Sequence, residues 1–362
     1  MNELDSLIIL SSIPRIGSVR IRRLVEYFGS AAAALQAKTE YWLDVPGFNT
    51  KNIPADSFFE GAESERNFEM IKRFGVRVIS YQCSEYPQHL LKIPDFPLVL
   101  YVKGRILPED NRSIAVVGTR NATIYGMETA EKMAAGLSGA GLTVVSGLAR
   151  GIDTAAHKAA VKKGRTIAVI GSGLADIYPR ENNRLAEEIS EKGAVISEFP
   201  MLTPPDRQNF PQRNRIVSGM TLGTLLIEAP LKSGAMLTME NAFDHERELF
   251  AIPGRTDSEN YRGNLSLLKS GKARLVENSS DIIKFFGIAE RKENFLFEKE
   301  SAIDLNPEEK KFISLLPQEE VSLHRIEELV QLPITKIHVL LMSLLLKNAI
   351  REYPGKIYKK LV

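Results

Sequence analysis

One short segment of the chain combines an aromatic side chain with several cations. Pro204–Arg215 reads PPDRQNFPQRNR, and it contains Phe210 together with Arg207, Arg213, Asn214 and Arg215. Proteins hold single-stranded nucleic acid by stacking its bases on aromatic rings and pairing its phosphates with cations. In the structural alternative, Phe210 packs into the core and the arginines pair with carboxylates at a sheet edge. The segment follows the strand pattern SEFP and precedes a helical pattern, so we expect a loop at the edge of a sheet.

Several glycine-rich turns supply further polar groups of the same kind. The turns carry Gly118, Thr119 and Arg120, then Ser146, Gly147 and Arg150, then Gly171, and finally Ser233 and Gly234. Glycine allows the backbone N–H groups of a turn to approach a ligand closely. We therefore expect these turns and the 204–215 loop to form one site for a phosphate-rich partner.

The elements that must position these turns form an α/β pattern. Each turn follows a short, β-branched run without polar alternation, which is typical of a strand buried on both faces. The runs are SIAVVG from Ser113, LTVVSG from Leu142, TIAVIG from Thr166, TLLIEA from Thr224 and LFAIPG from Leu249. A helical pattern follows each one, as in an open parallel sheet that binds ligands at the carboxyl ends of its strands.

Helices are predicted over Tyr125–Gly139, Thr154–Lys163, Glu181–Lys192, Ala235–Arg247 and Ser279–Phe286. Asp153 and Ser233 are suited to cap the second and the fourth. Gly141, Gly164 and Gly193 follow the first three as stop signals. Two further strands are predicted before the main sheet, over Val76–Tyr81 and Leu98–Lys103. Residues 74–287 are thus predicted to form one extended Rossmann-like domain.

The N-terminal segment, residues 1–70, has a helical pattern with two hairpin signals, Ile13–Gly17 (IPRIG) and Val45–Asn49 (VPGFN). The segment resembles a SAM-like or helix-hairpin-helix domain, which presents backbone N–H groups to DNA phosphates. Each hairpin keeps one of the usual two glycines, with Arg15 and Asn49 in place of the others. A helical cap that has lost the DNA contact is therefore the alternative, and a DNA role for this domain stays open.

The C-terminal segment follows a charged linker over residues 288–305. Residues 306–362 predict three helices, Pro307–Leu316, Leu323–Gln331 and Ile334–Lys347, followed by a two-stranded ribbon over Ala349–Leu361 with its turn at Pro354–Gly355. Three helices and a ribbon are typical of a winged helix, which often reads DNA with its third helix. Here the third helix is apolar around most of its circumference. A structural or protein-contact role is therefore favoured over base reading.

Composition excludes several classes of protein. The net charge of +2 means that any nucleic-acid site must be a local patch. The single cysteine, Cys83, excludes an internal disulfide and a cysteine-based zinc site. The N-terminus lacks the basic region of a signal peptide, and its apolar stretch is too short to span a membrane. We expect a cytoplasmic protein without a membrane span.

Motifs for common cofactors are incomplete or missing. The first turn has one glycine where a dinucleotide fingerprint needs three, and the chain contains no P-loop sequence. No metal or cofactor is therefore expected. Glu198, Glu228 and Asp153 lie near strand ends, where each could hold an arginine or cap a loop. An enzyme remains the rival class, because Ser218–Glu228 (SGMTLGTLLIE) partly resembles the PGGxGTxxE motif of phosphoribohydrolases. A non-catalytic nucleotide-binding module is the third possibility.

Six stretches of the middle segment resemble one family closely. They are VGTRNATIYG, VSGLARGIDTAAH, TIAVIGSGLADIYPREN, NFPQRNRIVSG, EAPLKSGAMLT and FAIPG, in that order between Val117 and Gly254. They resemble the DprA/Smf family, the bacterial DNA-processing proteins of natural transformation. The flanking segments fit as well, since members often carry an N-terminal SAM-like domain and a C-terminal winged helix.

The resemblance implies a protein that binds single-stranded DNA without sequence preference. It also implies a homodimer that protects incoming strands and loads the RecA recombinase, with no catalytic step. Carried onto this sequence, it implies a phosphate contact for Arg120 and a base contact for Phe210. Gly118, Ser146 and Gly147 would offer N–H groups or close approach, and Arg213 and Arg215 would line the same pocket.

Overall fold

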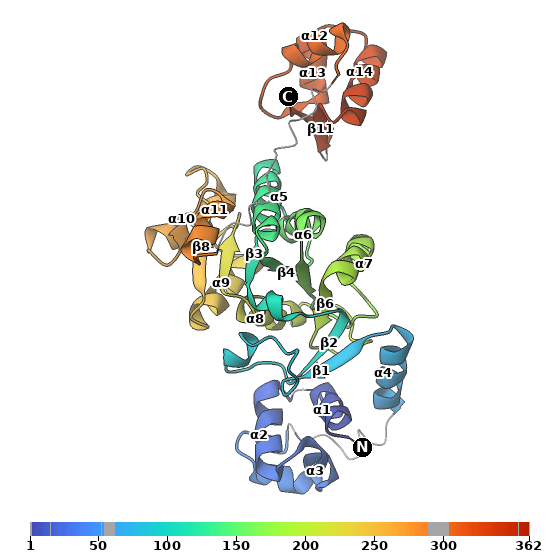
Figure 1. The fold of residues 1–362 in the computed structure, drawn as a ribbon, viewed down its shortest axis with the longest axis vertical. Helices are drawn as coiled ribbons and strands as arrows, with labels where there is room; N and C mark the ends of the chain where they lie inside the picture. Colours follow the sequence, from blue (N-terminus) through green and yellow to red (C-terminus); the bar gives the residue numbers. More distant parts are fainter. Residues whose placement is uncertain are drawn as a thin grey trace. The chain divides into compact units, whose positions relative to one another are not determined.

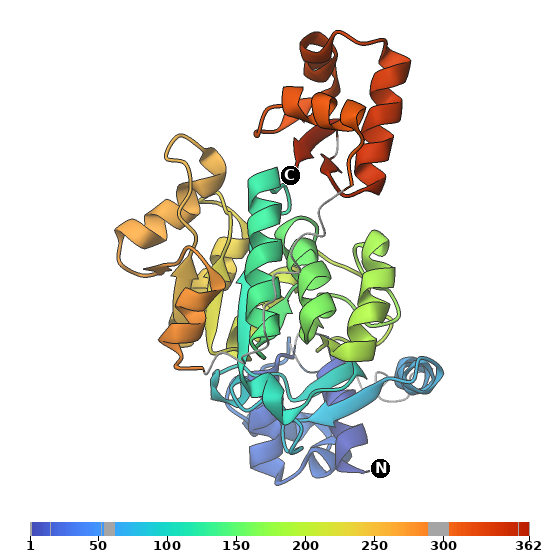
Figure 2. The same ribbon diagram turned by 45° about the horizontal axis from the view of Figure 1, so that its top comes forward.

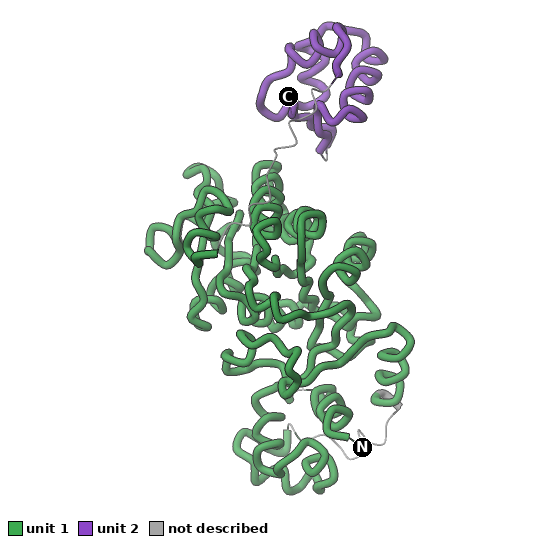
Figure 3. The backbone as a smooth tube through the Cα atoms, viewed as in Figure 1, with its two compact units in different colours: residues 1–290 green, residues 291–362 purple. Residues whose placement is uncertain are grey.

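The computed structural model describes residues 2–14, 16–51, 53, 62–288, 304–353 and 355–361. The chain divides into two compact units, residues 1–290 and residues 291–362, which Figure 3 colours separately. The larger unit contains the predicted helical and Rossmann-like segments.

The larger unit is built on a nine-stranded sheet with the strand order β1-β2-β6-β5-β4-β3-β7-β8-β9. All neighbours from β6 to β9 are parallel, whereas β2 runs antiparallel to both β1 and β6. The strands are β1 (Arg77–Ser80), β2 (Val99–Gly104), β3 (Ser113–Val117), β4 (Thr143–Ser146), β5 (Thr166–Val169), β6 (Ala194–Ser197), β7 (Gly223–Leu226), β8 (Glu248–Ala251) and β9 (Arg274–Leu275). The predicted extended Rossmann-like sheet is confirmed.

The strands are buried on both faces, as the unalternated apolar runs predict. Ile114 and Val116 pack on the side of α5, α6 and α11, whereas Ala115 and Val117 belong to a core shared with α8 and α9. Figures 1 and 2 show α5, α6 and α7 side by side along the sheet. The helices are α5 (Ile124–Gly139), α6 (Ile152–Lys163), α7 (Asn183–Lys192), α8 (Asn209–Gly219), α9 (Gly234–Asp244), α10 (Arg262–Lys269) and α11 (Ser279–Phe285).

Helix ends follow the predicted signals with one exception. Ser233 caps α9 through a hydrogen bond from the Met236 N–H, and Gly164 and Gly193 terminate α6 and α7. Asp153 was predicted to cap the second helix, and this is wrong because α6 begins earlier, with Gly151 as its cap residue. The Asp153 carboxylate instead accepts hydrogen bonds from the preceding turn.

The N-terminal helices share one hydrophobic core with the sheet. They are α1 (Glu3–Ser12), α2 (Ser18–Phe28), α3 (Ala31–Gln36), the 3-10 helix η1 (Thr39–Asp44) and α4 (Ala62–Arg73). Leu7, Leu24 and Trp42 are fully buried in the cluster that also contains the strand residues Leu100 and Ile167. The segment is thus anchored to the Rossmann-like part.

The first predicted hairpin joins α1 to α2, and a helix follows it as expected. The second hairpin follows η1. Its expected helix falls largely on residues 52 and 54–61, outside the described residues, and so does Arg15 of the first hairpin.

The smaller unit contains α12 (Pro307–Leu315), α13 (Leu323–Val330) and α14 (Ile334–Leu346), close to the three predicted helices. The predicted two-stranded ribbon is formed by β11 (Ile350–Tyr353) and β12 (Ile357–Lys360). The prediction missed a third strand, β10 (Val321–Ser322), which pairs with β12. Pro354 of the predicted turn lies outside the described residues. The winged-helix assignment stays a prediction.

The described residues contain no single helix that is both long and apolar enough to cross a membrane. By length and composition alone, α13 and α14 pass that test together, and they meet at a bend of 113°.

Candidate functional site

A cavity of about 780 Å³ lies at the carboxyl ends of the central parallel strands. It opens at the point where the strand order changes direction. Strands β4 and β3 lie on one side of this point, and β7 lies on the other. Open α/β sheets bind their ligands at this position. The cavity is lined by the turns after β3, β4 and β7 and by one side of α8 and α9.

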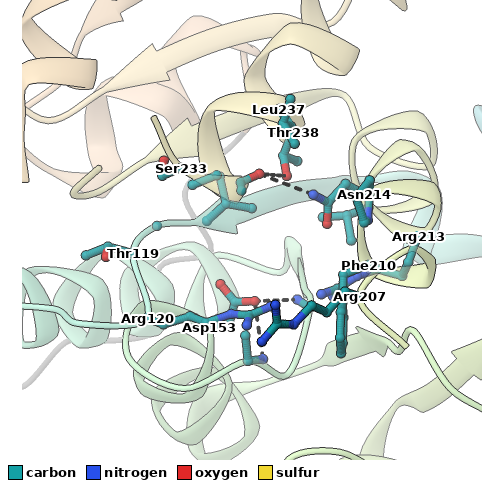
Figure 4. Close-up of a pocket in the computed structure, with 18 of the residues that line it drawn as sticks. Thr119, Arg120, Asp153, Arg207, Phe210, Arg213, Asn214, Ser233, Leu237 and Thr238 are labelled. Carbon is teal, nitrogen blue, oxygen red and sulfur yellow. Dashed lines mark hydrogen bonds between the residues drawn. The ribbon is translucent and has the colours of Figure 1, made fainter. Parts of the chain in front are cut away.

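Figure 4 shows how the labelled side chains surround this cavity. Thr119 and Arg120 come from the turn after β3, and Phe210, Arg213 and Asn214 face them from α8. Ser233, Leu237 and Thr238 approach from the third side, at the start of α9. The structure therefore brings most of the predicted site residues to one place.

An aromatic and cationic platform forms one wall. The Arg120 guanidinium carbon lies 5.1 Å from the centroid of the Phe210 ring, which is the geometry of a cation–π contact. Tyr178 lies on the same ring, with the two ring centroids 5.9 Å apart. Arg120 is exposed, and Tyr178 keeps 38% of its surface exposed. A base and a phosphate could therefore both reach this wall.

Two buried side chains of opposite charge, Arg213 and Asp153, support the floor of the cavity. Arg213 is 4% exposed, and its Nη1 donates to the Val169 carbonyl over 2.7 Å. Burial lowers the pKa of the Arg213 guanidinium to about 10, the attraction of Asp153 opposes this shift, and the charge of Arg120 adds to it. Burial also raises the pKa of the Asp153 carboxyl, against the attraction of Arg213. Arg213 therefore supports the cavity floor more than it offers charge to a ligand.

The turn after β4 contributes structure where ligand contacts were expected. The Gly147 N–H donates to Asp153 over 3.1 Å, and the buried Ser146 hydroxyl donates to the Val116 carbonyl over 2.7 Å. Neither group offers its hydrogen to the cavity. Gly147 lines the cavity, but its lack of a side chain makes room for Arg213.

The start of α9, across the cavity from Arg120 and Phe210, adds groups that favour an anion. Ser233 and Gly234 line the cavity at the first turn of this 11-residue helix, and exposed Lys232 precedes them. A helix N-terminus carries partial positive charge and unpaired N–H groups, which suit anions. Asn214 joins this side to α8, because its Nδ2 donates to the Gly234 carbonyl over 3.2 Å.

Two predicted site residues, Arg215 and Arg150, form ion pairs and do not line this cavity. Arg215 pairs with Glu198 and with Asp95, whose Oδ2 lies 3.3 Å from its Nε, and it does not line this cavity. The expectation that Arg213 and Arg215 share one pocket is therefore wrong. Arg150 pairs with Glu181 at the exposed surface, beside a small recess next to Tyr178 and Phe210.

The error on Arg215 has a simple cause. The 204–215 segment was predicted to be a loop, but α8 already begins at Asn209. Residues two apart on a helix point in nearly opposite directions. The helix therefore directs Arg213 to one side and Arg215 to the other. Gly171, also predicted to contact a ligand, lies behind Phe210, since an added Cβ would be 2.9 Å from the ring.

The carboxylates near the strand ends hold structure together, as predicted. Glu228 is fully buried, and its carboxylate accepts from the Thr123 backbone and hydroxyl, from Asn260 and from Tyr261. Glu228 is also absent from the cavity lining. This arrangement does not favour the phosphoribohydrolase alternative, which needs that glutamate at the ligand.

Sequence reasoning missed Tyr178, Lys232 and Leu237 as lining residues. Each lies inside a stretch that resembles the family, in IYPREN or EAPLKSGAMLT. The available signal for Tyr178 was an aromatic residue followed by proline, in the segment after a predicted strand. Arg207 was noted in the loop and does line the cavity.

The fold and the cavity define a Rossmann-like α/β protein with a candidate ligand site at the switch point of the sheet. Residues 77–287 match the family described as DNA recombination-mediator protein A. The chain belongs to this family, which confirms the DprA/Smf resemblance.

Individual relatives support the same assignment. Protein Smf of Synechocystis is 30% identical, covering 97% of each chain. The crystal structure of DNA processing protein A from Streptococcus pneumoniae is 32% identical, with a TM-score of 0.68 over 78% of this chain and 98% of that one. The Helicobacter pylori protein, whose structure describes a single-stranded DNA binding mode, is 29% identical, with a TM-score of 0.53 over 58% and 95% of the two chains.

Proposed function

We propose that this chain binds single-stranded DNA without sequence preference, in the cavity at the switch point of the sheet. The observation that carries the proposal is the Arg120–Phe210 pair, 5.1 Å apart, beside the exposed ring of Tyr178. Stacked bases and paired phosphates are what such a platform holds.

The charge around the cavity fits a phosphate backbone. Arg120, Arg207 and Lys232 are exposed at its lining, and the N-terminus of α9 faces it. The lining carboxylate, Asp153, is 7% exposed and is balanced by Arg213 and by backbone N–H groups. A negatively charged strand therefore meets an excess of positive charge.

Sequence independence follows from the kind of contacts. Every base has a face that stacks on an aromatic ring, and phosphates are the same at each nucleotide. Reading a base sequence would need side chains directed at base edges in a fixed register. The platform of Arg120, Phe210 and Tyr178 imposes no such register.

We further propose the role that the family resemblance implies. The protein would act as a homodimer in the cytoplasm, protect incoming strands during natural transformation and load RecA onto them. It would do so without a catalytic step, since Glu228 and Asp153 are engaged in structural hydrogen bonds. The description of the family as recombination mediators supports this proposal.

The direct test is fluorescence anisotropy of a labelled oligothymidylate with the purified full chain, beside the matching duplex, at two salt concentrations. We expect tight, salt-sensitive binding of the single strand and much weaker binding of the duplex. Affinity should fall with salt with a log–log slope of about −0.7 per phosphate neutralised. Absence of strand binding at low salt would refute the proposal and direct attention to mononucleotides. RecA filament formation on the bound strand would then test the loading role.

A further inference from the structure

A second cavity, of about 840 Å³, lies on the far side of α8 from the first. It is enclosed by the turn between α1 and α2, the segment from Asp95 to Val99 that leads into β2, and the residues that follow β6. Both cavities belong to the larger unit.

Three buried polar atoms in residues lining this cavity have no hydrogen-bond partner among the described residues. They are the Ser11 hydroxyl oxygen, Oε1 of Glu198 and Nη1 of Arg215. Buried polar atoms in native proteins almost always have a partner, so three of them beside one cavity point to a polar occupant.

The two charged members of this group form a donor beside an acceptor. Arg215 Nη2 already donates to Glu198 Oε2, which leaves Nη1 as the unmatched donor and Oε1 as the unmatched acceptor. An occupant that matches them carries an acceptor and a donor on neighbouring atoms. The edge of every nucleobase has this combination, whereas a bare phosphate has acceptors only and would also face Glu198 and Asp95.

Helix α8 connects the second cavity to the first. Asn209, Gln212 and Arg215 recur every third residue and line the second cavity, while Phe210 and Arg213 line the first. The segment before α8 forms the border, with Thr203 on one side and Arg207 on the other. A DNA strand that stacks a base on Phe210 and continues over the start of α8 therefore reaches the second cavity.

The outer wall carries positive charge for the backbone of such a strand. Arg20 and Arg23 of α2 line the cavity, and each is held in place by the second hairpin. Arg20 Nε donates to the Gly47 carbonyl over 2.9 Å, and Arg23 Nη1 donates to the Pro46 carbonyl over 3.0 Å. Fixed cations at the wall suit a phosphate.

We propose that the second cavity holds another nucleotide of the bound single strand, with its base edge against Glu198 and Arg215 and its phosphate near Arg20 and Arg23. This inference rests on the proposed function of the first cavity. It gives the N-terminal helical segment a part in strand binding through a shared cavity with α8.

Two glycines allow each cavity to be filled separately. Gly17 lines the second cavity and Gly234 lines the first, and a Cβ built on either has no atom within 4 Å. Gly17→Trp and Gly234→Trp are therefore matched occluding variants. Glu26 is exposed on α2 and lines neither cavity. Glu26→Trp therefore controls for the effect of adding a tryptophan side chain to the surface. Gln212→Trp provides a second way to fill the second cavity if Gly17→Trp folds poorly.

The experiment measures affinity for oligothymidylates of increasing length, from about 4 to about 16 nucleotides, the range of single-strand sites. For the wild type we expect affinity to rise stepwise once the oligonucleotide reaches the second cavity. Gly17→Trp and Gln212→Trp should match the wild type on the shortest oligonucleotide and bind the longest about tenfold more weakly. Gly234→Trp should weaken binding at every length, and Glu26→Trp at none.

The outcomes separate this inference from the proposed function. If the wild type binds and Gly234→Trp is impaired, but Gly17→Trp and Gln212→Trp follow the wild type at all lengths, the second cavity holds no nucleotide and the first keeps its role. If the wild type binds no oligonucleotide, the proposed function itself fails. Crosslinking of 4-thiothymidine along the longest oligonucleotide should label the α1–α2 turn in the wild type, and loss of that label in Gly17→Trp would support the inference.

Discussion

The guanidinium of Arg213 occupies the space that a side chain at position 147 would need. A Cβ built on Gly147 would lie 1.7 Å from Arg213 Nη1 and 2.4 Å from its central carbon. The glycine just after β4 therefore permits a buried arginine under the cavity floor. The two residues are far apart in sequence, but each needs the other in its place.

Gly147→Ala should destabilise the larger unit, because the added methyl group must displace a buried charge from its partners. Overpacking alone costs about 1–3 kcal/mol, and thermal denaturation should show a lower melting temperature. Gly234→Ala is the control, since nothing lies within 4 Å of its added Cβ. Equal melting temperatures for Gly147→Ala and the wild type would mean that Arg213 can move without cost.

Arg120→Ala should weaken binding of all single strands by a similar factor, because Arg120 is exposed and is proposed to contact a phosphate. The log–log salt slope should become shallower by about 0.7. Anisotropy titrations at several salt concentrations measure both effects. Arg184→Ala, whose side chain is 91% exposed on α7, should leave the slope as it is. Identical slopes for Arg120→Ala and wild type would remove Arg120 from the phosphate contact.

Phe210→Ala should reduce affinity by the loss of one stacked base, about 1–3 kcal/mol, with little change in salt slope. Its ring also supports Arg120, so the comparison needs Phe210→Tyr, which keeps an aromatic face. We expect Phe210→Tyr to retain most of the affinity in the same anisotropy assay. Intact binding by Phe210→Ala would assign the ring to the core alone.

Removal of residues 306–362 should leave strand binding largely in place, because both cavities lie in the unit of residues 1–290. Circular dichroism should confirm that the truncated chain is folded before its affinity is measured. A folded truncation that no longer binds oligothymidylate would transfer the site to the C-terminal unit.

The buried His157 should make stability depend on pH. Burial, with the charge of Arg213 adding to its effect, lowers the pKa of His157 from 6.5 to about 3. The unfolded chain therefore binds a proton between these values and the folded chain does not, so the stabilisation is present above about pH 6.5 and is lost as the pH falls towards 3. Denaturant unfolding at several pH values measures the free energy of unfolding. As the pH falls, this free energy should decrease less in His157→Gln than in the wild type. The same dependence of the unfolding free energy on pH in both proteins would contradict the lowered pKa of His157.

Local sequence patterns were sufficient for most of the architecture. Unalternated apolar runs such as SIAVV identified the strands, because a parallel strand covered by helices on both faces has no polar side. Ser233 as a cap and Gly193 as a stop marked helix ends through contacts within a few residues. β9 escaped notice, since two exposed residues leave no hydrophobic pattern.

The composition of the site was also largely readable from the sequence, because turns at the carboxyl ends of parallel strands must meet at one edge of the sheet. Arg120 and Phe210 could be placed together on that ground. The contact of Phe210 with Tyr178 depends on the path of the loop after β5, which no local pattern specifies.

The direction in which each side chain points was decided by the tertiary structure. Once α8 starts at Asn209, residues 213 and 215 differ by about 200° around its axis. Arg213 is directed beneath the first cavity, and Arg215 is directed to Glu198 and the second. The sequence determined which residues gather at this edge of the sheet, because strand and turn patterns are local. The phase of one helix, fixed by its packing on the sheet, divided those residues between two cavities.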